Sequence, residues 1–248
     1  IVSADLLYLC DHDVEKLKSF DAKNISSDLN EVASKVDILI LAVKPQSFKE
    51  LAGEIKIGIK NKLVISIMAG VPTRSIYSLL GTKKIIRVMP NMPARIGQGV
   101  SGWFAGKYVT KAEKKEMARL LSALGLVVEL KQESLLDTVT AVSGSGPAYF
   151  FYLCEQLEAG AIKLGLDKKT ARVLAEQTFL GSAALLKNKK MSVGQLCQSV
   201  ISRKGTTAAA MDVLRKNGFD KIFERALSAA FKRAQELARC HSESPMRR

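Results

Sequence analysis

The sequence predicts an α/β domain over residues 1–132 and an all-helical domain over residues 133–248. In the first part, short apolar runs alternate with amphipathic segments, which is typical of β-α units. From about Glu133 onward this alternation stops and Ala- and Leu-rich helical segments follow one another. At 248 residues, 47% of them hydrophobic, the chain is long enough for two such domains.

The apolar runs of the first part are nearly continuous, which favours a parallel sheet covered on both faces. The predicted strands are residues 5–10, 36–43, 62–69, 84–89 and 126–131. The helical segments between them are residues 13–20, 47–55, 73–80 and 111–124.

The second part is divided by breaks at Ser143–Gly146, Gly165, "KNKKMS", "SRKGTT" and "KNGF". We expect the first break to be a Ser/Gly-rich turn that leads through Pro147 into a helix. Ala-rich helices without a sheet must pack on other helices, so we expect a second copy of the chain as their partner. A self-contained helical bundle is the alternative.

Composition excludes several classes of protein. The run "ILILAV" (Ile38 to Val43) is far shorter than the roughly 20 residues of a membrane span, and no secretory signal opens the chain, so we expect a cytoplasmic protein. Four widely spaced cysteines and only two histidines give poor material for a metal site, and we expect reduced, mostly buried thiols. The net charge of +14 is dispersed among acids, which favours a small anionic substrate or cofactor over nucleic acid.

Ligands of open α/β sheets bind at the carboxyl ends of the strands, and three such ends carry candidate residues. Asp11 follows the first predicted strand, Lys44 and Pro45 the second, and Ala69 the third. In a dinucleotide-binding fold an acidic residue after the second strand binds the ribose of NAD, but Asp11 can equally form a turn or cap a helix. Lys44 can equally lie in a solvated turn.

A dinucleotide fold needs a strand and a Gly-rich turn about 20 residues before that acidic residue. The chain opens instead with "IVSADLLYLCD", with no GxGxxG before Asp11. We therefore expect either a fragment whose first βα unit is missing or a fold without its phosphate-binding loop.

A second candidate site lies in "VISRKGTTAAAMDVL". Its hydroxyl groups and free backbone N–H groups gather at a helix start, as a bound carboxylate requires, and two cations stand beside them. The alternative is an N-cap followed by an ordinary Ala-rich helix. The residues concerned are Ser202, Gly205, Thr206 and Thr207, with Arg203 and Lys204 as the cations.

Six segments together resemble the pyrroline-5-carboxylate reductase family: "ILAVKPQ", "VISIMAGV", "IIRVMPNMP", "AVSGSGPAYFF", "GQLCQSVISRKGTT" and "ALSAAFKRAQEL". The resemblance covers nearly the whole chain. It implies a Rossmann-like N-terminal domain, here without its first βα unit, and an all-α dimerisation domain that interlocks two subunits, with larger rings of dimers possible. It also implies reduction of Δ1-pyrroline-5-carboxylate to L-proline with NADPH or NADH, the last step of proline biosynthesis.

Residue by residue, the resemblance places the nicotinamide against Ala42, Val43, Lys44, Pro45 and Ala69. It places the substrate carboxylate on the loop with Ser202, Gly205, Thr206 and Thr207. It also places the Thr207 hydroxyl, our catalytic candidate, at the ring nitrogen of the substrate.

This chain departs from the family pattern in three segments. It has "SRKGTT" for the usual "SPGGTT" and "MPNMP" for "MPNTP", and it has Asp11 and His12 where the family often binds the phosphate of NADP. A carboxylate at that position repels phosphate, so we expect a preference for NADH. The alternative to the enzyme is a non-catalytic dimerising protein that has lost its phosphate-binding loop.

Overall fold

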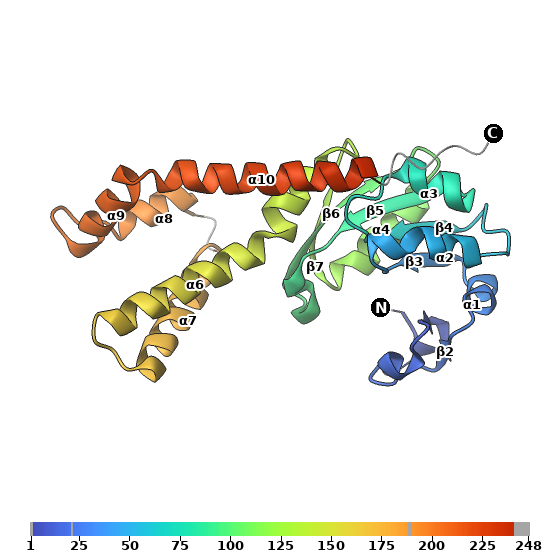
Figure 1. Ribbon diagram of the computed structural model, residues 1–248, viewed down its shortest axis with the longest axis horizontal. Helices are drawn as coiled ribbons and strands as arrows, with labels where there is room; N and C mark the ends of the chain where they lie inside the picture. Colours follow the sequence, from blue (N-terminus) through green and yellow to red (C-terminus); the bar gives the residue numbers. More distant parts are fainter. Residues whose placement is uncertain (1, 21, 188–189, 241–248) are drawn as a thin grey trace. The chain divides into compact units, whose positions relative to one another are not determined.

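The computed structural model describes residues 2–20, 22–187 and 190–240 (Figure 1). The chain divides into two compact units. The first holds residues 1–145 and 230–248, and the second holds residues 146–229. The predicted domain ranges 1–132 and 133–248 remain a prediction, and each unit is described by itself.

Five strands of the first unit form one sheet, in the order β3 (Ile38–Leu41), β4 (Leu63–Ser66), β5 (Ile85–Met89), β6 (Gly99–Ala105) and β7 (Gly125–Glu129). All neighbours are parallel except β5 and β6. The antiparallel β6 departs from the predicted arrangement because only the short turn η4 (Met92–Ile96) joins it to β5. A parallel strand would need a crossover of a dozen or more residues.

The first residues form a separate pair of parallel strands, β1 (Tyr8–Cys10) and β2 (Asn24–Ser26). Before and between them lie two 3₁₀ turns, η1 (Ala4–Leu6) and η2 (Val14–Leu17), in place of the helix expected over residues 13–20. The sequence did not reveal β2, because it is three residues long and two of them are polar. From β2 the chain enters α1 (Leu29–Lys35), which leads to β3.

Helices cover both faces of the five-stranded sheet, as expected. On one face α2 (Phe48–Glu54) and α3 (Thr73–Leu80) pack on β3 and β4, with Phe48 and Ile76 almost completely buried. On the other face α4 (Lys111–Ser122) contributes Met117 and Leu121 beside Trp103. Burial of these apolar side chains is the main force that holds the unit together.

The expected turn at Ser143–Gly146 is wrong. The chain continues from α5 (Leu135–Val139) through a π-helical segment, η5 (Thr140–Gly144), and α6 begins at Gly146. The Ser145 N–H donates to the carbonyl of Thr140 at 2.8 Å, a bond across five residues. The Ser143 hydroxyl donates to the Val139 carbonyl at 3.0 Å, so this polar side chain is satisfied by the preceding helical turn.

The second unit is entirely helical in its described residues. Its elements are α6 (Gly146–Lys163), α7 (Lys168–Leu185), α8 (Val193–Ser199), α9 (Thr206–Lys216) and residues 219–229 of α10 (Phe219–Cys240). The breaks expected at Gly165, at "SRKGTT" and at "KNGF" are confirmed, while the break at "KNKKMS" includes residues 188 and 189, which lie outside the described residues. Tyr149 of α6 meets Phe223 of α10 edge to face, with ring centroids 5.7 Å apart.

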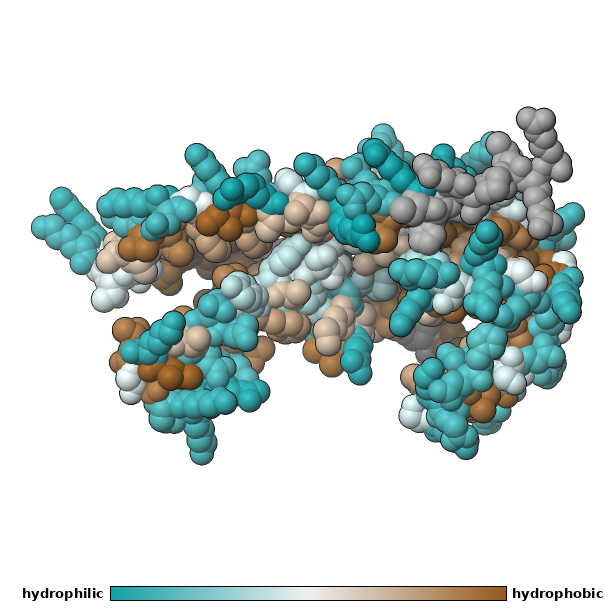
Figure 2. All heavy atoms as spheres, in the orientation of Figure 1, coloured by the Kyte–Doolittle hydropathy of each residue, from teal (hydrophilic) through white to brown (hydrophobic). Residues whose placement is uncertain are grey.

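Apolar side chains of this helical unit are largely exposed. Among its described hydrophobic residues only Ala171 and Ala175 are buried, whereas Phe150, Phe151 and Tyr152 are each about 60% exposed. Figure 2 shows brown hydrophobic side chains on the surface of this unit. One copy of these helices therefore does not form a core, which argues against a self-contained bundle.

No helix in the described part of the chain is long and apolar enough to cross a membrane. Among the thiols whose surroundings the structure describes, Cys10 and Cys154 are half-buried and Cys197 is exposed, so these three are more accessible than expected. Burial raises the pKa of the Cys10 thiol, with a further increase from the nearby carboxylate of Asp11.

The loop after β4 is packed tightly against the end of α10 within the first unit. Gly70 has φ +73°, a conformation that side chains disfavour, and a Cβ there would lie 2.8 Å from the Cβ of Leu237. Only glycine satisfies both conditions.

We expect Gly70→Ala to lower the free energy of unfolding by about 2 kcal/mol or more, from backbone strain and overpacking together. Thermal and urea unfolding would measure this loss. Gly53→Ala is the matched control: Gly53 lies in α2 with no atom within 4 Å of an added Cβ, so this variant should be as stable as the parent or slightly more so. Equal effects of the two variants would contradict the packing account.

Candidate cofactor and substrate sites

The carboxyl ends of β3 and β4 lie side by side. Leu41 pairs with Ser66, and the N–H of Ile67 donates to the carbonyl of Leu41 at 3.1 Å, so the two chains leave the sheet at the same edge. Ala42 follows β3 directly, and Ala69 lies three residues beyond the end of β4. The structure thus brings together two of the three predicted strand ends.

The segment after β3 turns immediately into a short helix. Lys44 is the N-cap of η3 (Pro45–Ser47), and its carbonyl accepts the Ser47 N–H at 3.0 Å. Ala42 and Lys44 are exposed, while Val43 and Pro45 are half-buried. Pro45 fixes the first residue of this turn, so an accessible backbone and a cation stand at a rigid strand end. No ion-pair partner of Lys44 occurs among the described residues.

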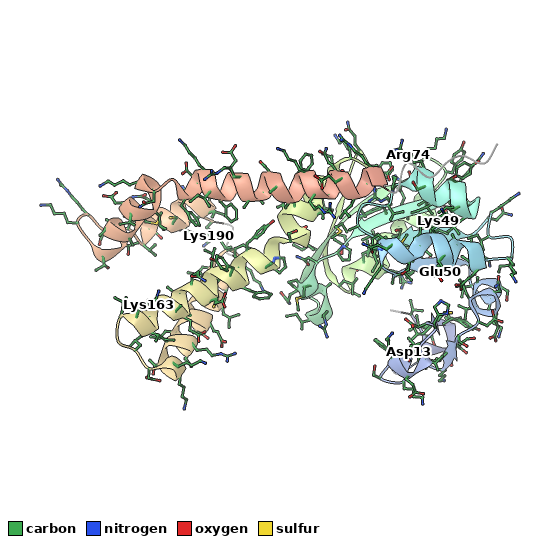
Figure 3. The ribbon with its side chains drawn as sticks, viewed as in Figure 1. Asp13, Lys49, Glu50, Arg74, Lys163 and Lys190 are labelled. Atoms are coloured by element: carbon green, nitrogen blue, oxygen red, sulfur yellow. The ribbon has the colours of Figure 1, made fainter. Side chains whose placement is uncertain are left out.

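Asp11 and His12 follow β1, which makes no strand pairing with β3. One carboxylate oxygen of Asp11 accepts the backbone N–H of Asp13 at 2.9 Å, so the turn-forming role that the sequence left open is present. The His12 Nε2 lies 3.7 Å from the carboxylate of Glu54 at the end of α2. Both side chains are exposed, and Figure 3 labels the neighbouring Asp13 on the same turn.

A GxGxxG string does occur in the chain, as "GQGVSG" over residues 97–102. It is not a phosphate-binding loop. Gly97 ends η4 in a left-handed conformation, and the string then runs into β6 rather than from a strand into a helix. The pattern lacks the strand-turn-helix context that gives it meaning.

The second predicted site lies at the start of α9 in the helical unit. Gly205 is the N-cap and supplies no side-chain bond to the first turn. No hydrogen bond of the Thr206 or Thr207 hydroxyl group occurs in the described part of the chain. This helix start therefore offers unpaired N–H groups and hydroxyl groups to an anion, and the macrodipole adds to the attraction.

The loop before α9 is tightly folded. The Gly205 N–H donates to the Ser202 carbonyl at 3.0 Å, and a Cβ on Gly205 would overlap the Ser202 hydroxyl oxygen. Lys204 has φ +60° and is the only non-glycine residue with positive φ in the described chain. The two cations, Arg203 and Lys204, are exposed beside the helix start.

The sequence analysis missed a polar cluster in the first unit. Arg87, on β5, is 7% exposed and donates to Glu133 at 2.9 Å, and the same carboxylate accepts the N–H and the hydroxyl of Thr73 at 2.7 and 2.8 Å. Burial raises the pKa of the nearby Asp137 carboxyl, and Glu133 adds to the increase while Arg87 opposes it. The arginine inside the apolar run "IIRVM" was the signal available in the sequence.

The first unit has the α/β fold of a dinucleotide-binding domain, with a mostly parallel sheet and helices on both of its faces. Residues 6–70 match the family described as "NADP oxidoreductase coenzyme F420-dependent", and residues 133–237 match "Pyrroline-5-carboxylate reductase dimerisation". The chain is 40% identical over 210 residues to the pyrroline-5-carboxylate reductase of Pseudomonas aeruginosa, which covers 84% of this chain and 77% of that protein. The chain belongs to the pyrroline-5-carboxylate reductase family.

Solved structures agree with this assignment. A pyrroline-5-carboxylate reductase from Coxiella burnetii superposes with a TM-score of 0.81 at 38% identity, covering 92% of this chain and 87% of the other. The pyrroline carboxylate reductase of Plasmodium falciparum, solved with NADP bound, gives 0.80 at 32% identity, with 87% and 82% covered. The family, the fold class and the enzyme class expected from the sequence are confirmed.

Because Lys204 occupies a conformation suited to glycine, we expect Lys204→Gly to raise the free energy of unfolding by about 1 kcal/mol. Chemical denaturation would measure the gain. Arg203→Gly is the matched control: Arg203 has no positive φ, so glycine there only adds disorder to the unfolded chain and should lower stability. A loss of stability in both variants would contradict the strain at Lys204.

Proposed function

We propose that this chain reduces Δ1-pyrroline-5-carboxylate to L-proline by hydride transfer from NAD(P)H, the last step of proline biosynthesis. Family membership supports the reaction. The uncapped start of α9, with its hydroxyl groups and two adjacent cations, is the observation that carries the substrate assignment. A carboxylate is the anion that such a helix start holds well.

The cofactor half of the proposal rests on the joined ends of β3 and β4. The backbone of Ala42, Val43, Lys44 and Pro45 would line one side of the nicotinamide and Ala69 the other. Small side chains at Ala42 and Ala69 leave the backbone accessible to a flat ring. The NADP named in the Plasmodium falciparum structure supports a nicotinamide dinucleotide as the cofactor.

The residues would act mainly by positioning. When bound, the reduced nicotinamide supplies the hydride, which adds to the carbon of the substrate's C=N bond, while the nitrogen of the pyrroline ring keeps or gains a proton. The N–H groups of α9 with Ser202 and Thr206 would hold the substrate carboxylate, and the Thr207 hydroxyl would hydrogen-bond the ring nitrogen. An iminium carbon accepts hydride readily, so orientation supplies most of what the reaction needs.

The helical unit would act as a homodimerisation domain, and larger rings of dimers would extend the same assembly. Its exposed apolar side chains and the matched dimerisation family support the dimer. We further propose a cytoplasmic enzyme with no nucleic-acid or membrane partner.

A non-catalytic dimerising protein is the second candidate function. The observation that favours it is the exposed apolar surface of the helical unit, which supports dimerisation whether or not a cofactor binds. Cofactor binding by the protein, measured by fluorescence of NADPH and NADH, separates the two candidates, because a dimerising scaffold binds neither.

For cofactor choice, we expect a higher kcat/KM with NADH than with NADPH. Asp11→Asn removes the charge and keeps the oxygen that accepts the Asp13 N–H, so it should raise kcat/KM for NADPH about tenfold. Asp13→Asn, a neighbouring exposed carboxylate, is the matched control and should leave the cofactor ratio unchanged. Equal or better turnover of the parent with NADPH would refute the assignment of Asp11.

For the catalytic residue, we expect Thr207→Val to lower kcat by about 100-fold or more, because it keeps the shape of the side chain and removes the hydroxyl. Thr207→Ser keeps the hydroxyl and should retain most of the rate. Initial rates of cofactor oxidation with Δ1-pyrroline-5-carboxylate measure both. A valine variant with the parent's kcat would remove Thr207 from the mechanism.

A further inference from the structure

The start of α3 is capped by a residue from a distant part of the chain. Its own N-cap, Pro72, supplies no side-chain bond. Glu133 takes that role from sixty residues away, accepting the Thr73 N–H at 2.7 Å with one oxygen and the Thr73 hydroxyl at 2.8 Å with the other. A carboxylate at a helix N-terminus is also favoured by the macrodipole.

Arg87 holds this carboxylate in place. Its Nη1 donates to Glu133 at 2.9 Å, and the guanidinium group is almost completely buried on β5. A buried ion pair is costly to break, because either partner alone would leave a charge without compensation. The position of the Thr73 backbone is therefore tied to the central strand of the sheet.

The segment held in this way is the loop that follows β4, residues 67–72. At its beginning the N–H of Ile67 donates to the carbonyl of Leu41. In its middle Gly70 packs closely against Leu237. At its end the N–H of Thr73 donates to the carboxylate of Glu133. Val71 is completely buried between these points. Ala69, which is half-buried, is thus fixed from both sides.

We propose that Glu133 is a positioning residue for hydride transfer: through Thr73 it fixes the loop that presents Ala69 to the nicotinamide. This inference rests on the proposed function. Small displacements of a positioning element are costly in rate, because the reacting atoms must stay within a narrow geometry. Glu133 itself need not touch the cofactor or the substrate.

The chain offers a closely matched control at the opposite edge of the same sheet. Glu113 is the third residue of α4 and forms a capping box with the N-cap Thr110: it accepts the N–H and hydroxyl of Thr110 at 2.7 and 2.8 Å, and it pairs with Lys84 at 2.8 Å. The two carboxylates are similarly exposed, 26% for Glu133 and 23% for Glu113. Lys84 precedes β5, so Glu113 stands at the amino end of that strand, away from the candidate cofactor residues.

The experiment compares Glu133→Gln with Glu113→Gln in the same protein. Hydrogen exchange of the peptide covering residues 67–77 is measured without ligands, and kcat and KM are measured for the cofactor and for Δ1-pyrroline-5-carboxylate. We expect Glu133→Gln to speed exchange in this peptide and to raise the KM for the cofactor about tenfold, with the KM for the substrate little changed. Glu113→Gln should change neither KM.

Thr73→Val provides a second test if Glu133→Gln fails to fold, because it removes only the hydroxyl bond and should produce a smaller change of the same kind. Equal cofactor KM values in the Glu133 and Glu113 variants would overturn the proposal, and so would unchanged exchange in residues 67–77. If the parent protein reduces no Δ1-pyrroline-5-carboxylate, the proposed function fails, whereas the exchange comparison still decides whether Glu133 orders the loop.

Discussion

The parallel pairing of β3 and β4 is the constraint on which the rest of the first unit depends. It brings two strand ends to one edge, continues beyond the sheet in the bond from Ile67 to Leu41, and sets where Ala42 and Ala69 stand. The helices α2 and α3 begin just beyond these ends and bury the same face of the sheet. The pairing of two core strands therefore places the candidate nicotinamide residues after β3 and β4, whereas Asp11 and His12 follow β1 in the separate pair of strands.

Much of this arrangement follows from the sequence. Continuous apolar runs predicted β3, β4 and β5. This pattern is typical of strands buried on both faces, as β4 and most of β5 are, whereas Ile40 of the edge strand β3 is 52% exposed. The short polar β2 was not predictable in this way, because its apolar content is too low, and the direction of β6 is set by the short connection from β5 rather than by its own residues. At Ser143–Gly146 the glycines indicated a turn, but the chain stays helical through η5, where Ala141 is buried and the Thr140 and Ser143 hydroxyl groups are satisfied by carbonyls of the preceding turn.

The substrate residues at the start of α9 were predictable from the sequence, whereas the Glu133 cluster near the candidate cofactor residues was not. The hydroxyl groups gathered at a predicted helix start singled out Ser202 and Thr207, the family resemblance gave them roles, and the structure adds that the helix start beside them is uncapped. It also shows that Lys204 keeps a glycine-like conformation, which no composition or periodicity indicates. The Glu133 cluster escaped prediction because its partners are 46 and 60 residues away in sequence.

The most direct test of this account is proline production by the protein, followed as proline formed together with reduced cofactor consumed when Δ1-pyrroline-5-carboxylate is supplied. The account predicts that the two quantities are equal, one proline for each cofactor oxidised, and that both are absent without the substrate. A protein that dimerises and binds cofactor but forms no proline would contradict it.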